Sequence, residues 1–379
     1  MTFGWFLVAL GLLALNGYVA FCLVRMPFQR RRRLKTRLAL GAHALLTLPC
    51  IVYFPCFFTG RTGSPLVHAL SYAAGFYLVI LLYAALLFAL ADLARCTGRL
   101  FAYPLPLRRW SARLYYRGLP LLLIAAILAA FGLSNGRALD VVSYDISLPR
   151  GASSLSSLHA VLLADAHIGT SVREEELRQI IEQVNALQPD VVFLCGDLYD
   201  EGTTAAQKQA AGALLGRIRS RYGTYAVTGN HEYASPHLSD ELAQLQAAGI
   251  HLLLDGTQVV PGRFCVAGRL DAKSSRRAPL AEVLQGADGT LPLILLDHRP
   301  QYKESRDSGR VDLLLSGHTH NGQIFPLDLF DPLVPALFYG AYTNGAMQTV
   351  VTSGAGSWAI PLRLGSTREI VDLHIRFDP

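Results

Sequence analysis

Five short polar clusters in this chain of 379 residues each follow an apolar, strand-like run. The clusters are Asp165-Ala166-His167, Gly196-Asp197-Leu198-Tyr199-Asp200, Gly229-Asn230-His231-Glu232, Asp297-His298 and Gly317-His318-Thr319-His320. Their carboxylate, amide and imidazole groups are the oxygen and nitrogen ligands that divalent transition metals take in proteins. The joint pattern therefore predicts a hydrolase with a pair of metal ions.

The spacing of the clusters predicts that they meet at one edge of a sheet. Asp165 precedes Asp197 by 32 residues and Asp197 precedes Asn230 by 33, close to the roughly 30 residues of one strand–helix–strand unit. We expect strands at residues 162–164, 190–195 and 224–227, with connecting helices at 172–187 and 204–220. Ligands of α/β folds collect at the carboxyl edge of such a sheet. Glycines in the clusters would let the backbone approach the site closely.

From about Leu158 to the C-terminus, the chain resembles the calcineurin-like metallophosphoesterases. The blocks Gly229-Asn230-His231-Glu232 and Gly317-His318-Thr319-His320-Asn321-Gly322-Gln323 are similar to those of the membrane-associated bacterial branch. The resemblance includes every metal-binding block but not the first 136 residues. It implies an α/β (α+β) fold in which two mixed β-sheets pack face to face with helices outside. Here an α-helical transmembrane region is expected to precede that fold.

Carried over residue by residue, the resemblance assigns ligands to two divalent metal ions. The first ion would be held by Asp165, His167, Asp197 and His320, and the second by Asp197, Asn230, His298 and His318. Asp197 would bridge the ions, which lie about 3.5–4 Å apart in sites of this kind. We expect manganese, and the same ligand types also fit iron, zinc, cobalt or nickel.

The resemblance also implies a mechanism. A hydroxide shared by the ions would attack phosphorus in line, since metal charge lowers the pKa of water from about 15.7 to near neutrality. The catalytic residue His231 would face the leaving group as a general acid or as a donor to the phosphate. Either Asp165 or Asp200 would hold its imidazole in the useful tautomer. Asp200 could instead cap a helix, and Glu232 could be a first-turn carboxylate, so neither is counted as a ligand.

Other candidate residues have weaker settings. His159, His237, His251 and His374 have no ligand-like sequence neighbours and are predicted to be surface or core residues. The segment Ser353-Gly354-Ala355-Gly356 lacks the lysine of a phosphate-binding loop and is predicted to be a turn.

Four apolar stretches precede the catalytic part, at about residues 3–24, 38–58, 66–93 and 114–133. The first three reach the roughly 20 residues that span a bilayer as a helix. The fourth needs Tyr115 and Tyr116 at the membrane interface to reach that length. We therefore predict a membrane region at residues 1–136 with about four transmembrane helices, a linker at 137–157 and a metallophosphoesterase domain at 158–379.

The charge is divided unevenly between these parts. Residues 1–134 contain 14 Lys and Arg against one acidic residue, Asp92, whereas the remainder contains 20 against 27. The basic residues crowd two of the loops between the apolar stretches, and only Arg61 lies in the other. Under the positive-inside rule, this predicts a multi-pass protein of the cytoplasmic (inner) membrane with its catalytic domain on the extracytoplasmic side. Anionic membrane lipids, and no nucleic acid, are the expected partners of the basic loops.

The substrate is the least specified part of the prediction. The long apolar segment Pro326–Gly340 follows the last metal-binding histidine, and it either packs on the core or forms an apolar lip that touches a membrane or acyl chains. The preferred substrate class is a lipid-linked phosphoester or pyrophosphate. Alternatives are a phosphodiesterase or phosphatase acting on soluble nucleotides or other small phosphoesters, a catalytically silent scaffold, and a transporter or sensor that uses the membrane spans. The sequence predicts no oligomeric state.

Overall fold

The computed structural model describes residues 2–25, 32–58, 64–101, 103–104, 106, 118–169, 171–200, 203–235, 237–326 and 338–379. The chain divides into two units, one made of residues 1–55 and 69–134 and the other of residues 56–68 and 135–379. Two features used above lie outside the described residues: the Tyr115-Tyr116 interface belt and residues 327–337 of the apolar segment.

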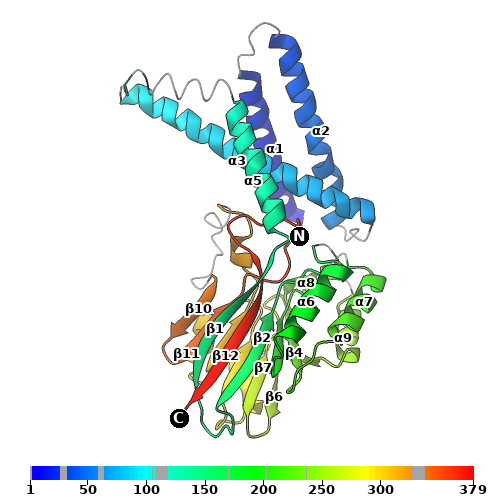
Figure 1. Ribbon diagram of the computed structural model, residues 1–379, viewed down its shortest axis with the longest axis vertical. Helices are drawn as coiled ribbons and strands as arrows, with labels where there is room; N and C mark the ends of the chain where they lie inside the picture. The colour runs from blue at the N-terminus through cyan, green and yellow to red at the C-terminus, as the bar shows by residue number, and fades with distance from the viewer. Residues whose placement is uncertain are drawn as a thin grey trace. The chain divides into compact units, whose positions relative to one another are not determined.

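Apolar helices make up the first unit (Figure 1). The helices that cover the four predicted stretches are α1 (Thr2–Arg25), α2 (Arg32–Phe58), α3 (Pro65–Leu100) and α5 (Leu119–Asn135). Among the described residues, one helical segment, Pro65–Gly98, is long and apolar enough to cross a membrane. The other three helices contain shorter apolar segments, Leu10–Val24, Leu40–Cys56 and Leu119–Asn135. The four-span arrangement thus stays a prediction.

Polar side chains join the first three helices. The Tyr77 hydroxyl of α3 donates to Asn16 Oδ1 of α1 at 2.7 Å and lies 3.1 Å from His43 Nδ1 of α2. Thr47 of α2 donates to the same hydroxyl at 3.0 Å. Hydrogen bonds of this kind hold apolar helices together when lipid removes the hydrophobic drive between them. His43 therefore has a packing role within this helical unit.

Two six-stranded mixed sheets form the second unit (Figure 1). The first sheet has the order β1-β12-β2-β3-β4-β5, and its strands are β1 (Leu139–Pro149), β12 (Arg368–Asp378), β2 (Ser157–Leu163), β3 (Val191–Cys195), β4 (Thr224–Val227) and β5 (His251–Leu252). The second has the order β10-β11-β9-β8-β7-β6, and its strands are β10 (Gly340–Asn344), β11 (Met347–Val351), β9 (Leu313–Ser316), β8 (Leu293–Leu296), β7 (Phe264–Gly268) and β6 (Gly256–Val260).

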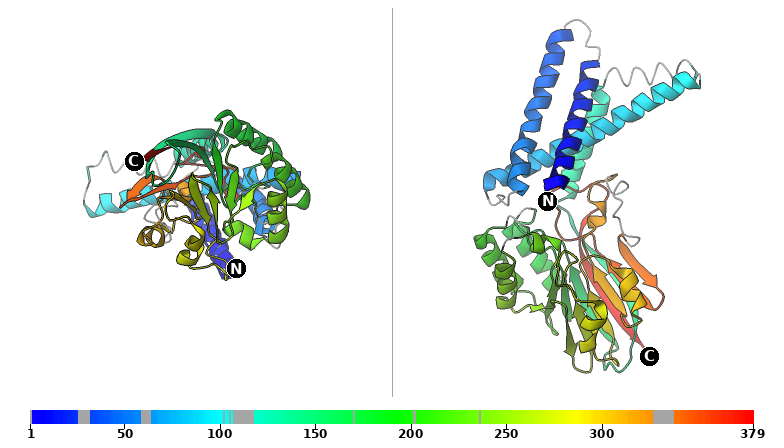
Figure 2. Two further views of the ribbon diagram at one scale, coloured as in Figure 1. Left: turned by 90° about the horizontal axis from the view of Figure 1, so that it is seen from below. Right: turned by 180° about the vertical axis from the view of Figure 1, so that it is seen from behind.

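Apolar side chains fill the space between the sheets, where Phe193 of β3, Val266 of β7 and Leu315 of β9 belong to one fully buried cluster. The outer face of the first sheet is covered by α6 (Glu174–Ala186), α7 (Ala205–Leu215) and α9 (Leu238–Ala247) (Figure 2). The outer face of the second is covered by α10 (Leu280–Val283), η1 (Leu284–Gly286) and α11 (Tyr302–Asp307). The prediction of two packed mixed sheets with helices outside is confirmed.

The helices that connect β2, β3 and β4 follow from local sequence. Residues 177, 180, 181 and 184 of α6 are apolar and buried, which is the spacing of one helix face. Each such side chain contributes roughly 1.5–3 kcal/mol when it is fully buried. At the start of α7, the Thr204 side chain accepts a hydrogen bond from the Gln207 amide and so caps the helix.

The segment predicted as a linker is mostly a strand, so that prediction was wrong. β1 pairs in parallel with β12 along its whole length, from Leu139 opposite Arg368 to Pro149 opposite Asp378. Ile146 and Leu148 are buried while Asp145 and Ser147 face outward, which is the alternation of a strand. The main segment of the second unit consequently begins at residue 135, before the predicted boundary at 158.

Candidate metal centre

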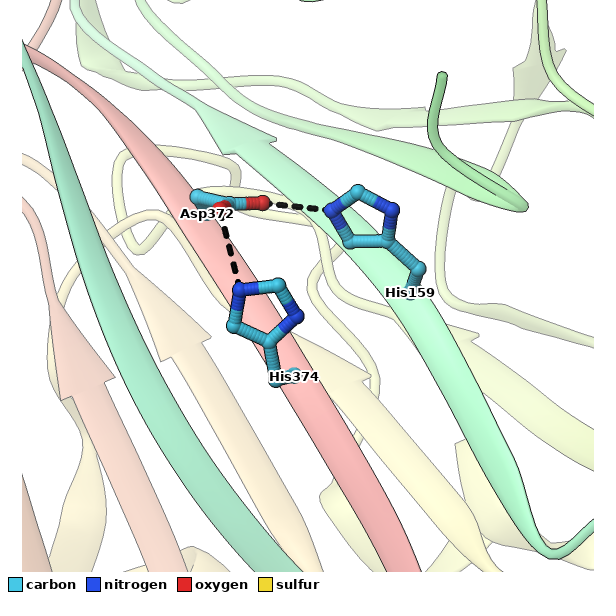
Figure 3. A group of neighbouring side chains, drawn as sticks. All are labelled: His159, Asp372 and His374. Carbon is cyan, nitrogen blue, oxygen red and sulfur yellow. Dashed lines mark hydrogen bonds and ion pairs between the residues drawn. The ribbon is translucent and has the colours of Figure 1, made fainter. Parts of the chain in front are cut away.

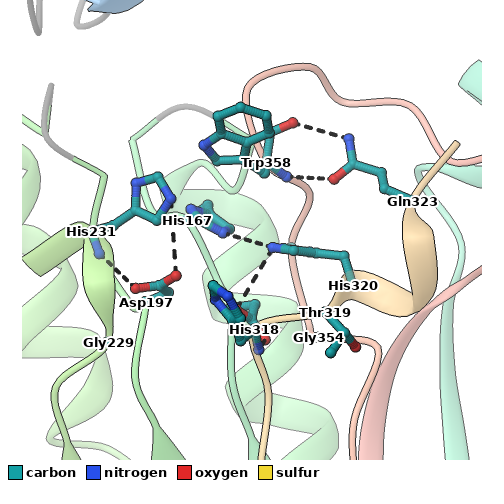
Figure 4. A network of polar contacts seen from close by, with 12 residues as sticks. His167, Asp197, Gly229, His231, His318, Thr319, His320, Gln323, Gly354 and Trp358 are labelled. Atoms are coloured by element: carbon teal, nitrogen blue, oxygen red, sulfur yellow. Dashed lines mark hydrogen bonds and ion pairs between the residues drawn. The ribbon is translucent and has the colours of Figure 1, made fainter. Parts of the chain in front are cut away.

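The predicted site residues all follow the carboxyl ends of strands from both sheets. Asp165 and His167 follow β2, Asp197 follows β3, Asn230 and His231 begin α8 (Asn230–Ala234) after β4, His298 follows β8, and His318 and His320 follow β9, where His320 begins η2 (His320–Gly322). The strands β2, β3 and β4 are parallel to one another, as are β8 and β9. The two sheets therefore bring these side chains to one place, as Figure 4 shows for five of them.

Ligand atoms in this place form three groups, one of which, His167, Asp200 and His231, shares His167 with another. The other two groups contain residues assigned to the two ions. The ligand atoms of Asp165, His167 and His320 lie within 4.8 Å of one another. His320 Nε2 is 3.1 Å from His167 Nε2 and 3.6 Å from Asp165 Oδ1. The second group contains Asp197, His298 and His318, again within 4.8 Å, and His298 Nε2 lies 3.0 Å from Asp197 Oδ2. The structure thus brings together three of the four residues that the resemblance assigned to each ion.

Backbone strain is concentrated at the same residues. The φ angles lie in the left-handed region at Asp165 (52°), His167 (48°), Asp197 (50°), His318 (74°) and His320 (50°). Such angles are uncommon outside glycine and persist where the surrounding structure holds them, which is typical of functional sites. Here the amides of Asp165 and His167 are held by the carbonyls of Gly196 and Asp197, at 3.0 and 3.1 Å.

Glycines allow the close approach that the sequence predicted. A Cβ atom added to Gly317 would collide with the Asp165 carboxylate, and one added to Gly229 would collide with that of Asp197. A Cβ atom added to Gly196 would lie 2.6 Å from the Gly229 amide nitrogen. No larger residue fits at these positions without movement of the loops that carry the ligands.

Further contacts orient the imidazoles. Asp200 Oδ1 lies 2.7 Å from His167 Nδ1, and the Cys195 carbonyl lies 2.8 Å from His298 Nδ1. A partner on Nδ1 fixes the ring and leaves Nε2 directed at the ligand group. Asp200 Oδ1 is also 3.7 Å from His231 Nδ1. Of the two carboxylates considered for orienting His231, Asp200 is thus the one beside its Nδ1.

The calcineurin-like phosphoesterase family model matches residues 158–322, which include all of these residues. An uncharacterized metallophosphoesterase of Campylobacter jejuni is 32% identical over 265 residues, which cover 68% of this chain and 69% of that protein. The chain belongs to the calcineurin-like metallophosphoesterase family. The family assignment places a phosphoesterase domain at residues 158–322.

A relative from Danio rerio is named transmembrane protein with metallophosphoesterase domain. It is 35% identical over 271 residues, which cover 67% of this phosphoesterase, and the chain spans 62% of the length of that relative. A solved structure of a dimetal phosphatase from Danio rerio is 13% identical, covers 58% of this chain and 99% of its own, and has a TM-score of 0.35. At that score the structural likeness adds nothing to the family assignment.

The donor set of the phosphoesterase fits divalent cations. Within the described part of the chain, Asp165 Oδ1 and Asn230 Oδ1 are buried and have no hydrogen-bond partner. Buried oxygens without partners are costly, and a cation would satisfy both. Burial raises the pKa of Asp165; it also opposes ionisation of Asp197, but the imidazoles of His298 and His231 hold the pKa of Asp197 well below its usual value.

The histidines of the centre differ in their protonation. Burial opposes the charged form of His298, yet the Asp197 carboxylate outweighs it and raises the pKa of His298 to about 10. Burial, together with the neighbouring His298, lowers the pKa of His318 to about 3. The two neighbouring imidazoles thus lie in opposite electrostatic surroundings, His298 beside a carboxylate and His318 beside another imidazole.

Glu232 has a role that the sequence did not reveal. Its side chain is buried and accepts four backbone hydrogen bonds, from the amides of Asp197 (3.0 Å), Leu198 (2.6 Å), Tyr199 (3.1 Å) and Gly229 (2.8 Å). It does lie in the first turn of α8, as predicted, but its carboxylate binds the turn that carries Asp197. The only signal in the sequence was a carboxylate next to the Asn-His pair.

Arg363 was also missed, because nothing near it in the sequence resembles a site. It is fully buried, and burial lowers its pKa to about 9. It donates to the carbonyls of His320 (3.1 Å), Ser353 (2.6 Å), Gly356 (2.5 Å) and Thr367 (2.9 Å). Arg363 therefore ties the Ser353–Gly356 segment to the loop that carries His320.

Proposed function

We propose that this protein is a membrane-anchored phosphoesterase that uses two divalent metal ions to hydrolyse phosphoester or pyrophosphate bonds, preferably in lipid-linked substrates. The observation that carries this proposal is the pair of neighbouring ligand groups built from Asp, His and Asn side chains. Asp197 connects them, because its Oδ2 lies 3.0 Å from His298 Nε2 of one group and its backbone carbonyl accepts the amide of His167 of the other at 3.1 Å. A shared carboxylate is what a two-ion site requires.

Each ligand group would hold one ion. Asp165, His167 and His320 would bind the first, Asn230, His298 and His318 the second, and Asp197 both. When bound, the two ions would supply the positive charge that makes water nucleophilic near neutral pH and that stabilises negative charge on the phosphate. The neutral amide oxygen of Asn230 leaves more of that charge available at its ion than another carboxylate would.

The surroundings of His231 support its proposed role toward the leaving group. Its imidazole meets the His167 ring edge-on with the ring centres 4.8 Å apart, and its Nε2 lies 3.9 Å from Asp197 Oδ2 (Figure 4). Asp200 beside Nδ1 favours a proton on that nitrogen and stabilises the ring when it is charged. His231 would give a proton to the departing oxygen of the substrate.

Exposed aromatic side chains support a substrate with an apolar portion. Trp358 is 40% exposed and its ring centre lies 6.2 Å from that of His231. Two hydrogen bonds fix its position, because its amide donates to Gln323 Oε1 at 2.8 Å and Gln323 Nε2 donates to its carbonyl at 2.9 Å. Phe325, two residues beyond Gln323, is 50% exposed. Aromatic surface beside a phosphate site suits an acyl or prenyl chain.

The two-ion proposal is tested by metal content and turnover together. Purified full-length protein loaded with Mn²⁺ should hydrolyse bis-p-nitrophenyl phosphate, and a chelator should abolish the activity. Asp197→Asn should lose activity by more than about a hundredfold, because loss of outer-sphere partners alone already costs 10–100-fold, and should retain less manganese. An active Asp197→Asn protein with its full manganese content would contradict the proposal, whereas a wild type that binds little manganese and shows no turnover would favour the scaffold alternative.

The lipid preference needs a matched pair of substrates. We expect kcat/KM to be at least tenfold higher for a phosphoester on a long acyl chain in mixed micelles than for the same headgroup on a short, soluble chain. Trp358→Ala should raise KM for the long-chain substrate only. Equal rates on both would remove the lipid preference, favour soluble phosphoesters such as nucleotides, and leave the phosphoesterase activity intact.

Membrane anchoring belongs to the same proposal. It is supported by the length of the Pro65–Gly98 segment, by the printed name of the Danio rerio relative and by the excess of basic residues in the first 134. The proposed arrangement is a multi-pass protein of the cytoplasmic membrane whose catalytic domain lies on the extracytoplasmic side.

A further inference from the structure

A second group of metal-ligand side chains lies on the outer face of the first sheet (Figure 3). His159 on β2 and His374 on β12 are directly opposite each other in an antiparallel pair, and Asp372 lies two residues before His374. His159 Nε2 is 2.6 Å from Asp372 Oδ1, and His374 Nε2 is 3.1 Å from Asp372 Oδ2. The sequence prediction treated both histidines as ordinary residues because their partner is far away in the chain.

This cluster is separate from the catalytic centre. His159 lies near the start of β2, whereas the catalytic Asp165 follows its end, six residues later. At about 3.3 Å per residue, the two Cα atoms are roughly 20 Å apart. No residue of the cluster belongs to the two catalytic ligand groups.

We propose that His159, Asp372 and His374 bind one zinc ion, with solvent completing the coordination. The ligand atoms of the three side chains lie within 4.8 Å of one another. Two imidazoles and one carboxylate form a three-ligand zinc set, with distances of about 2.0–2.2 Å from metal to ligand. Because both Nε2 atoms already face the same carboxylate, small side-chain rotations would place an ion between them. Each imidazole would bind the ion through an Nε2 that carries no proton, so a proton on that atom would move to Nδ1 or to solvent.

The scaffold holds the three ligands in place before any ion arrives. The two rings are stacked, with centres 5.0 Å apart and an interplanar angle of 17°. Asp372 is buried and accepts a hydrogen bond from the Ser143 hydroxyl of β1 at 3.2 Å, so the carboxylate is oriented from a third strand. Partners of this kind around a ligand strengthen metal binding.

An ion could reach the cluster from solvent. The His374 side chain is about half exposed. A hollow of about 570 Å³ borders the two histidines, and the carboxylates of Asp145 and Asp190 line it. Arg376 also lines the hollow, but its guanidinium is engaged by Asp378 at 2.8 Å and Ser147 at 3.0 Å. The approach is therefore suited to a cation.

The test counts zinc in the full-length protein. Protein purified in detergent is stripped with a chelator, loaded with excess Zn²⁺, freed of unbound metal and analysed for zinc per chain. The wild type should retain one zinc more than the double variant His159→Gln/His374→Gln, since the catalytic centre contributes equally to both. His237→Gln, which changes an exposed histidine elsewhere, should match the wild type. Equal zinc counts in the wild type and the double variant would overturn the proposal.

A second measurement guards against a folding defect in the double variant. The single variant His374→Gln changes a half-exposed side chain and should also lose one zinc while keeping the wild-type circular dichroism spectrum. In the wild type, Zn²⁺ should slow the modification of His159 and His374 by diethyl pyrocarbonate at least severalfold, as mapped by mass spectrometry. Unchanged modification of both histidines in the presence of zinc would contradict the site.

Discussion

Asp200 serves two imidazoles at once, one in a ligand group and one beside it. Its Oδ1 lies 2.7 Å from His167 Nδ1 and 3.7 Å from His231 Nδ1. A single buried carboxylate therefore orients a proposed ligand and the proposed acid. Metal binding by His167 and proton transfer by His231 would both depend on Asp200. The two roles can be separated by measuring metal content and turnover independently.

His231→Ala provides that separation. We expect kcat to fall by about 10²–10⁴, the usual contribution of a positioned acid, while the manganese content stays at the wild-type level. The loss should be larger for substrates with alkoxide leaving groups than for p-nitrophenyl esters, which need no proton. His237→Ala, at an exposed position, is the control. Equal losses with both kinds of leaving group would contradict the role of His231 as a general acid and favour its role as a donor to the phosphate.

Glu232→Gln tests a residue that binds the backbone of the Asp197 turn rather than the side chain of a predicted ligand. The Glu232 carboxylate accepts hydrogen bonds from four backbone amides. In the glutamine variant, the side-chain NH2 group would be buried against some of these N–H groups, and two donors cannot form a hydrogen bond. We expect a loss of about 3 kcal/mol in the free energy of unfolding, since hydrogen bonds to a charged group contribute roughly 1.5–3 kcal/mol each. Urea denaturation measures it. Glu174→Gln, in the exposed first turn of α6, should change stability by less than about 0.5 kcal/mol.

Buried charge also joins two of the helices that cover the first sheet. Lys208 of α7 lies 2.7 Å from Glu241 of α9, and both side chains are almost completely buried. Ser235 donates to the same carboxylate at 2.7 Å. Burial raises the pKa of Glu241, so the carboxylate depends on these donors to stay ionised. The packing of α7 against α9 thus depends on the Lys208–Glu241 ion pair as well as on apolar contacts.

Removing one partner of this ion pair should lower the free energy of unfolding more than replacing both partners with apolar residues. Lys208→Met leaves a buried carboxylate without its cation, and we expect a loss of about 3–5 kcal/mol. Lys208→Met/Glu241→Leu should recover most of that loss, because an apolar pair of similar volume removes the uncompensated charge. Chemical denaturation of both variants gives the comparison. A double variant less stable than the single one would contradict this account.

Local patterns were sufficient to predict β3, β4 and the helices on either side of β3, because each has its own apolar period. The strand predicted at residues 162–164 begins earlier, since β2 is Ser157–Leu163. The meeting of the ligand clusters followed from the parallel order of those strands. The pairing of β1 with β12 could not be predicted in this way, since Leu139 and its partner Arg368 are 229 residues apart. The contacts of Arg363 with His320 and of His159 with Asp372 could not be predicted either, because their partners are also far apart in the sequence. Such contacts depend on topology rather than on neighbouring residues.

The charge distribution of the whole molecule predicts its orientation in the membrane. A β-lactamase fused after Pro379 should protect growing cells from ampicillin, because the C-terminus is expected on the extracytoplasmic side, and a green fluorescent protein at the same position should stay dark. Fusion after Arg109, in a loop predicted to be cytoplasmic, should give the reverse of both results. Fluorescence from the fusion at Pro379, without resistance, would place the catalytic domain in the cytoplasm.

The position of β12 determines when the first sheet can be completed. This strand, residues 368–378, lies between β1 and β2, although both were synthesised more than two hundred residues earlier. Until it emerges from the ribosome, β1 has no neighbour in the sheet and its apolar side chains stay open to solvent. A chain that stalls before residue 368 would therefore present an unpaired strand to chaperones and proteases.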